Sequence, residues 1–159
     1  EIDIMEARGN EPNKVLGTLH YGARWPSNVH SSREFVFPEG QDITEFHVYA
    51  IEWEPGEIRW FVDDRQYAVQ NFWWSFSKTE GGRGIAPSAE SELNPWPAPF
   101  DQPFYLIMNL AIGGGFVGNP DSTTPFPAEM SVDYVRVYQR IGGYGAVKPR
   151  GEGKLPFDR

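Results

Sequence analysis

The chain contains no cysteine, which excludes disulfide bonds, zinc–thiolate sites and thiol chemistry. It has no apolar run long enough to cross a bilayer and no signal-peptide pattern at its start. Basic residues are in the minority, with 14 Lys and Arg against 22 Asp and Glu and a formal net charge of −8. Nucleic acid and anionic membrane surfaces both require a basic face. We therefore expect no nucleic acid and no membrane among the partners.

Aromatic and turn-forming residues are abundant instead. Aromatics make up 15% of the chain, including six Trp, and 17 Gly and 14 Pro punctuate it. Bulky aromatics between frequent turn residues are typical of all-β proteins, and they also suit a ligand with flat apolar faces, such as a sugar ring. At 159 residues the chain has the length of one domain, and because residue 1 is not Met we expect a processed or excised product.

The first half of the chain predicts a β-meander. Its strand-like stretches alternate between two faces and are separated by turn signals, of which Pro55-Gly56 and Asp63-Asp64 are the strongest. The predicted strands cover residues 15–23, 45–54, 57–63 and 65–70. Residues 71–102 are rich in Gly, Pro and aromatics and are predicted to form long loops, which often carry binding function on a rigid scaffold.

The second half predicts two further strands and a tail. Residues 102–114 form a nearly continuous apolar run, bounded by Pro103 and a triple glycine, and predict a strand buried on both faces. Residues 130–140 alternate cleanly and predict a closing strand. Residues 141–159 have little hydrophobic pattern, so we divide the chain into a domain part, 1–140, and a tail or linker, 141–159.

The first ten residues, EIDIMEARGN, place three carboxylates among apolar residues. In a regular strand Glu1 and Asp3 share one face and Glu6 points to the other. A β-bulge around Ile4-Met5 would put all three acids on one face and leave Ile2 and one bulge residue for the core, and bulges are frequent beside active sites. The sequence therefore predicts a bulged strand with an acidic face.

Neighbouring carboxylates differ in their proton affinities, because they cannot all ionise without mutual cost. Such a set can supply one nucleophile and one protonated acid, as in glycosidases that use two carboxyl groups. Two other interpretations are a solvated acidic strand edge and a calcium or magnesium site, since hard cations prefer oxygen ligands. The interleaved Ile-Ile-Met argues against the strand edge, because it needs a buried opposite face.

Five blocks of the chain resemble glycoside hydrolase family 16. They are EIDIME at 1–6, GTLHYG at 17–22, FHVYAIEWEPGEIRWFVDD at 46–64, PFYLIMNLAIGG at 103–114 and MSVDYVRVYQ at 130–139. The bulged form of the acidic motif resembles the endo-β-1,3-glucanases (laminarinases) of that family, whereas its un-bulged form resembles the lichenases. The resemblance implies a concanavalin-like β-jelly-roll sandwich whose concave sheet forms the substrate cleft.

The resemblance also implies roles for individual residues. Glu1 matches the nucleophile, Glu6 the general acid/base and Asp3 the assisting carboxylate. His20 matches a histidine near the acid/base, with a hydrogen-bonded structural role as the alternative.

Two further positions match the substrate cleft. Trp96 lies in the loop where such enzymes present a sugar-stacking tryptophan. Trp73 and Trp74 are rival candidates, and a role in the core is an alternative for all three. Asn109 matches a polar residue that faces the cleft, where a structural role is more expected than direct catalysis.

No cofactor is implied for catalysis, but a structural Ca²⁺ is implied on the convex side, with Asp133 among its ligands. The family motif normally lies near the middle of its domain, and here it begins the chain. We therefore expect that the strands N-terminal to it are missing from this chain. Half a sandwich leaves sheet edges and apolar surface uncovered, so a companion chain or self-association is expected.

The expected function is retaining endo-hydrolysis of β-1,3-glucosidic bonds in laminarin-like β-glucans by an extracellular, secreted enzyme. Whether this chain is active alone is left open. The alternatives are another specificity of the same family, namely mixed-linkage β-glucan, agarose or carrageenan, and a non-catalytic β-glucan-binding module. Retention of all three acids argues against a pure binding module.

Overall fold

The computed structural model describes residues 1–158 and is all-β, as the composition predicts. Its only helical element within these residues is a single 3-10 turn, η1 (Glu90–Glu92), and none of its helices could span a membrane. The strands are β1 (Ile2–Ala7), β2 (Lys14–Gly22), β3 (Asn28–Val36), β4 (Tyr49–Glu54), β5 (Glu57–Val62), β6 (Arg65–Gln70), β7 (Thr79–Glu80) and β8 (Arg83–Gly84). The strands predicted at 15–23, 45–54, 57–63 and 65–70 are confirmed as β2, β4, β5 and β6. β4 is shorter than expected, and β3 was not predicted.

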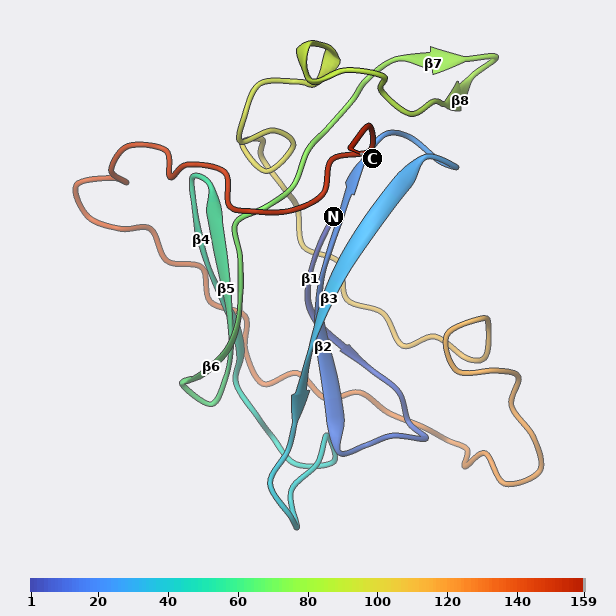
Figure 1. Ribbon diagram of the computed structural model, residues 1–159. Coiled ribbons are helices and arrows are strands. Elements are labelled where there is room, and N and C mark those ends of the chain that lie inside the picture. Colours follow the sequence, from blue (N-terminus) through green and yellow to red (C-terminus); the bar gives the residue numbers. More distant parts are fainter. Residues whose placement is uncertain (159) are drawn as a thin grey trace.

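Two three-stranded antiparallel sheets form the body of the structure, in the orders β1-β2-β3 and β4-β5-β6 (Figure 1). The second sheet is the part of the meander predicted at residues 45–70, whereas the strand predicted at 15–23, β2, belongs to the first sheet. Its first turn contains Gly56 at φ 90°, and its second contains Asp63 and Asp64 at φ 47° and 64°. Positive φ at both central residues is typical of the turns whose twist matches that of the two flanking strands.

The two sheets pack face to face through alternate residues of their central strands. On β5 the buried side chains are Ile58, Trp60 and Val62, and on β2 the buried apolar side chains are Val15 and Leu19. Period-two burial on both central strands is the pattern of a sandwich. Trp60 and Leu19 belong to one core cluster, so each sheet covers the inner face of the other.

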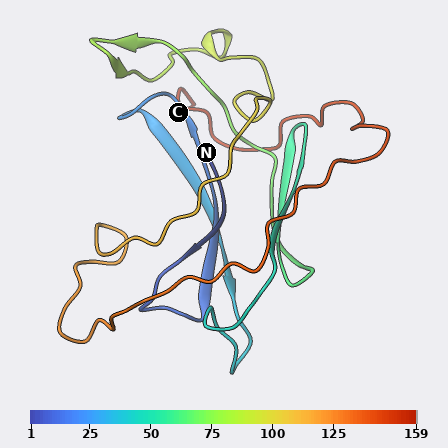
Figure 2. The same ribbon diagram turned by 180° about the vertical axis from the view of Figure 1, so that it is seen from behind.

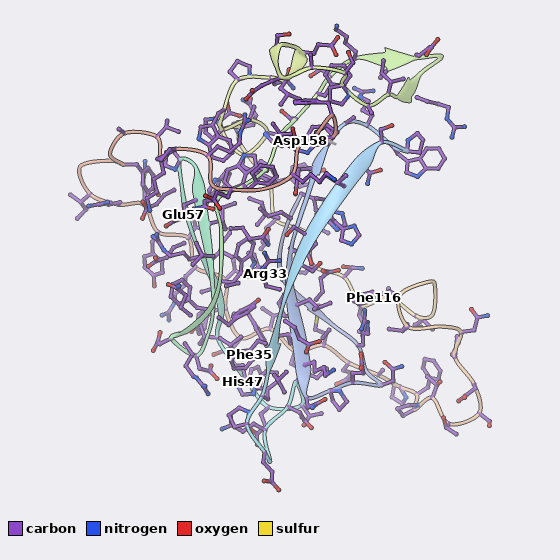
Figure 3. The ribbon with its side chains drawn as sticks, viewed as in Figure 1. Arg33, Phe35, His47, Glu57, Phe116 and Asp158 are labelled. Carbon is purple, nitrogen blue, oxygen red and sulfur yellow. The ribbon has the colours of Figure 1, made fainter. Side chains whose placement is uncertain are left out.

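A second cluster closes one end of the core. Phe35, labelled at the end of β3 in Figure 3, packs edge-on against Phe37 at a centroid distance of 5.1 Å. The ring of His47 lies 4.6 Å from that of Phe37, and His47 Nδ1 contacts Asp63 Oδ2 at 2.6 Å. The connection between β3 and β4 is therefore tied to the meander by aromatic packing and by a polar contact.

The strands predicted at 102–114 and 130–140 are wrong for this chain. Neither segment forms a strand, and Tyr105, Ile107 and Val137 are 84%, 70% and 92% exposed. In Figure 2 the second segment, orange to red, crosses in front of the sheets, and the loop that connects the two segments extends to one side. A strand needs hydrogen-bonded neighbours, and no strand of residues 1–158 pairs with either segment. An apolar pattern indicates that a segment favours a buried strand, but it does not show whether a neighbouring strand is available to pair with it.

The segment 141–159, predicted as a tail or linker, has no helix or strand in its described part but contacts the domain part. Lys148 N–H donates to Pro55 O at 3.0 Å, and Gly151 N–H donates to Asn71 O at 2.7 Å. Leu155 packs against a cluster of buried aromatics around Trp74. These contacts hold the segment across the top of the meander.

Gly17 is required where the two sheets meet. A Cβ atom there would lie 2.4 Å from Trp60 Cδ1 and 2.6 Å from the Tyr67 hydroxyl. We expect Gly17→Ala to lower the free energy of unfolding by about 1–3 kcal/mol, the usual cost of overpacking a core. Gly9→Ala is the matched control, because nothing lies within 4 Å of its Cβ position. Urea unfolding of both variants measures the difference, and equal stabilities would contradict the packing.

Candidate active site

β1 contains the predicted bulge. Asp3 pairs with Thr18 of β2, and the next recorded pair is Glu6 with Leu16. Three steps along β1 therefore match two along β2, which is the count of a β-bulge. Met5 of the bulge packs against the cluster around Val15, and Ile2 packs against the cluster around Leu19. The division of β1 into a core side and an acidic side is confirmed.

The bulge brings the three carboxylates to one face of the sheet. Glu1 lies opposite His20, because His20 N–H donates to Glu1 O at 3.0 Å. Asp3 and Glu6 lie opposite Thr18 and Leu16. Partners at alternate positions of β2 share a face, so Glu1, Asp3 and Glu6 project from the same side of the sheet. This side is opposite to the one that packs on the meander.

Trp60 fixes the bulge from the opposite sheet. Its indole is fully buried, and its Nε1–H donates to the carbonyl oxygen of Asp3 at 3.0 Å. Gly17 lies against this indole, and because glycine has no side chain the indole can reach β1. A buried N–H needs a partner, so this hydrogen bond fixes the position of the Asp3 backbone at the same time.

Asp3 has a raised pKa. Burial, followed by the charges of Glu1 and Glu6 and a hydrogen bond with the Glu1 carboxyl group, raises its pKa to about 7. Its Oδ2 is buried and accepts no hydrogen bond within the described chain, and it lies 3.5 Å from His20 Nε2. A protonated Asp3 carries one proton between two acids. The raised pKa of Asp3 agrees with the different proton affinities that are expected of neighbouring carboxylates.

His20 is joined by a residue that the sequence analysis did not single out. His30 of β3 pairs directly with His20, and their ring centroids are 5.5 Å apart. Glu1, His20 and His30 thus form one row across the three strands of the first sheet. The missed signal was β3 itself, whose stretch NVHSSREFV alternates weakly and is mostly exposed.

The tryptophans differ in their surroundings. Trp73 and Trp74 are buried at 0% and 4% exposure, so both belong to the core. Trp96 is half-buried: its ring stacks on Trp73 at 4.5 Å, and its Nε1–H donates to Lys148 O at 2.7 Å. The guanidinium of Arg150 lies 5.3 Å from the centroid of the same ring. Contact between Trp96 and a sugar stays a prediction.

Asn109 and Asp133 do not lie in a strand, so no strand pairing within residues 1–158 brings them to the acidic face. Both are exposed and lie in the irregular segments. Calcium takes six to eight oxygen ligands, and Asp133 belongs to no cluster of three metal-ligating side chains among residues 1–158. Binding of a structural Ca²⁺ at Asp133 stays a prediction, and no step of the chemistry depends on it.

The acidic face has its own group of ligand atoms. Glu1, Asp3 and His20 each offer one such atom, and all of these atoms lie within 4.8 Å of one another. Two carboxylates and an imidazole could bind a divalent ion, but such a group also performs proton chemistry without a metal.

Comparisons with known proteins agree with this geometry. Residues 1–73 match the model of glycosyl hydrolases family 16. The chain is 46% identical over 142 residues to a glucan endo-1,3-beta-glucosidase A1 of Niallia circulans, covering 87% of this chain and 19% of that protein. It is 43% identical over 143 residues to a beta-glucanase of Rhodothermus marinus, covering 89% and 45%.

A solved structure, that of the endo-beta-1,3-glucanase from Pyrococcus furiosus, superposes with a TM-score of 0.56 at 36% identity. The superposition covers 79% of this chain and 42% of that one. The all-β sandwich with grouped carboxylates on one face agrees with this likeness to glycoside hydrolases. More specifically, the first 73 residues of the chain are similar to glycosyl hydrolases family 16. The chain spans less than half the length of these relatives.

The raised pKa of Asp3 predicts a pH-dependent stability. In the unfolded chain an aspartate titrates near pH ~3.9, so between about pH 4 and 7 the folded protein holds a proton that the unfolded chain has released. The stability from this group is present at low pH and is lost as the pH rises through 7. Asn cannot ionise, so we expect Asp3→Asn to gain stability relative to wild type as the pH rises from 5 to 7.5.

Urea unfolding at several pH values measures this difference, whose slope cannot exceed about 1.4 kcal/mol per pH unit for one proton. Asp101→Asn, at an exposed position, is the control. A difference between Asp3→Asn and wild type that stays constant with pH would contradict the prediction.

Proposed function

We propose that this chain carries the catalytic carboxylates of a retaining endo-β-1,3-glucanase. The observation that supports this most directly is the bulged β1, which sets Glu1, Asp3 and Glu6 on one face opposite His20, Thr18 and Leu16. Retaining glycosidases use one carboxylate as nucleophile and a second carboxyl group as acid and then base.

In the first step the Glu1 carboxylate attacks the anomeric carbon, and the bond from that carbon to the glycosidic oxygen breaks. Glu6 gives its proton to the departing oxygen, so the leaving chain departs as an alcohol. In the second step Glu6, now a carboxylate, takes a proton from water while that water attacks the anomeric carbon. The Glu1 ester bond breaks, and both carboxyl groups return to their starting states.

Asp3 assists by holding a proton close to Glu1. Its raised pKa and its hydrogen bond with the Glu1 carboxyl group mean that Asp3 is largely a neutral donor below pH ~7. A hydrogen bond to the carboxylate holds Glu1 before attack and stabilises it again as a leaving group in the second step. His20, 3.5 Å from Asp3, borders the same group and is proposed to contact the substrate together with Trp96 and Asn109.

The substrate class rests on the relatives. Two of the proteins named above are endo-1,3-glucan hydrolases by their descriptions, so laminarin-like β-1,3-glucan is the proposed substrate. We propose further that the enzyme is secreted.

The exposed apolar segments around Tyr105, Ile107 and Val137 are proposed to be covered by a companion polypeptide or by self-association.

Replacement of the catalytic acids tests the mechanism. We expect Glu1→Gln and Glu6→Gln each to lower laminarin hydrolysis by about 10³-fold or more, because the first loses the nucleophile and the second the acid/base. Glu80→Gln, on the exposed strand β7, should leave the rate unchanged. Reducing-sugar release is the measurement, and turnover within tenfold of wild type in either active-site variant would contradict the assignment.

A panel of polysaccharides tests the specificity. Laminarin should be cleaved faster than mixed-linkage β-glucan, agarose or carrageenan when reducing-sugar release is compared at equal polymer mass. Faster cleavage of one of the other polymers would retain the chemistry and change the substrate. Binding of laminarin without cleavage of any polymer would instead identify a non-catalytic glucan-binding module.

A further inference from the structure

Thr18 is a buried hydroxyl in the middle of the acidic face. It is 1% exposed, although it belongs to the face that also carries the acids. Its Oγ1 donates to Glu6 Oε2 at 2.6 Å and lies 2.8 Å from Ser32 Oγ on β3. Three strands therefore contribute one side chain each to a continuous hydrogen-bond network.

The bulge in β1 makes this hydrogen-bond network possible. Thr18 is paired with Asp3 in the ladder and reaches Glu6 as a diagonal neighbour, while Glu6 itself is paired with Leu16. Diagonal neighbours on one sheet face lie within reach of longer side chains. The extra residue of the bulge returns Glu6 to the face of Thr18, and without it Glu6 would point into the core.

The direction of the hydrogen bonds follows from counting protons. A threonine hydroxyl has one proton and two lone pairs, and an ionised carboxylate can only accept. When Glu6 is ionised, the Thr18 proton is therefore committed to Glu6 Oε2, and Ser32 must donate to Thr18. The same direction persists when Glu6 carries its own proton on Oε1, because Oε2 still accepts from Thr18.

We propose that Thr18, backed by Ser32, is a positioning residue for the acid/base Glu6. The hydroxyl fixes Oε2, so the carboxyl group cannot rotate freely and Oε1 is the oxygen left to exchange a proton with the glycosidic oxygen and with water. Both steps of the mechanism need Glu6 in this orientation. This role rests on the proposed function and adds two residues to it.

The test separates proton donation from general structural support. Two substrates are compared in the full-length protein: laminarin, whose leaving sugar alcohol needs a proton, and the dinitrophenyl β-glycoside of laminaribiose, whose leaving phenolate does not. Because kcat/KM reports the first step, we expect Thr18→Val to lower it about tenfold or more on laminarin. On the dinitrophenyl substrate the same variant should stay within about threefold of wild type, since no acid is needed there.

Two variants serve as controls. Thr18→Ser keeps the hydroxyl and should restore kcat/KM on laminarin to within about threefold of wild type. Thr44→Val removes a similar hydroxyl–carboxylate hydrogen bond, from Thr44 to Asp42 Oδ1 at 2.5 Å, on an exposed loop, and should change neither substrate. Thermal unfolding of each variant shows whether it is folded.

Equal losses on both substrates in folded Thr18→Val, or no loss on laminarin, would overturn the positioning role. If Thr18→Val does not fold, Ser32→Ala serves as the test instead, because Ser32 is the last, half-buried member of the hydrogen-bond network. It should show a smaller loss confined to laminarin, and an unchanged or unselective rate overturns the proposal. A wild-type protein that cleaves neither substrate overturns the proposed function itself, which distinguishes that failure from a failure of Thr18 alone.

Discussion

The hydrogen bond from the Trp60 indole to the backbone of Asp3 is the contact on which the acidic face depends. It connects the core of the sandwich to the strand that carries the carboxylates. The large indole fills the space between the two sheets, and its one polar atom reaches β1 only because Gly17 has no side chain there. Packing and polar satisfaction thus require the same geometry, and any shift of β1 would break both.

Electrostatics opposes the packing at this point. Three carboxyl groups on one face repel when ionised, and burial of Asp3 adds a desolvation cost. The structure relieves part of this repulsion by raising the pKa of Asp3 to about 7, so that one of the three groups holds its proton. Thr18 supplies a further donor, at Glu6. Grouping acids in this way costs stability, as is common at functional sites.

The first half of the chain could be predicted from sequence because its signals are local. Turn residues such as Gly56 and Asp63 fix the meander, and three acids among apolar residues fit one face only if a bulge is present. The strand β3 was missed because its alternation is weak and its side chains are mostly exposed. The long-range contacts of Trp60 and Thr18 could not be found, since a sequence pattern does not show which residue of another strand lies opposite.

The segments around Ile107 and Val137 show the converse limit. Their apolar character is clear in the sequence, yet a strand is made by its neighbours, and no strand of residues 1–158 pairs with them. The contacts of Trp96 with Lys148 and Arg150 likewise depend on the segment after residue 140, whose sequence carries little pattern. Local reasoning therefore succeeded for the acidic strand and failed where the partner lies far away in sequence.

The central claim is that Glu1 attacks the sugar and Glu6 does not. Covalent trapping tests it most directly, because a 2-deoxy-2-fluoro laminaribiosyl substrate with a good leaving group slows breakdown of a glycosyl-enzyme ester. Peptide mass spectrometry of the trapped full-length protein should locate one added 2-deoxy-2-fluorolaminaribiosyl group on the Glu1 carboxylate. An adduct on Glu6, or the absence of any adduct in a protein that still cleaves laminarin, would contradict the account.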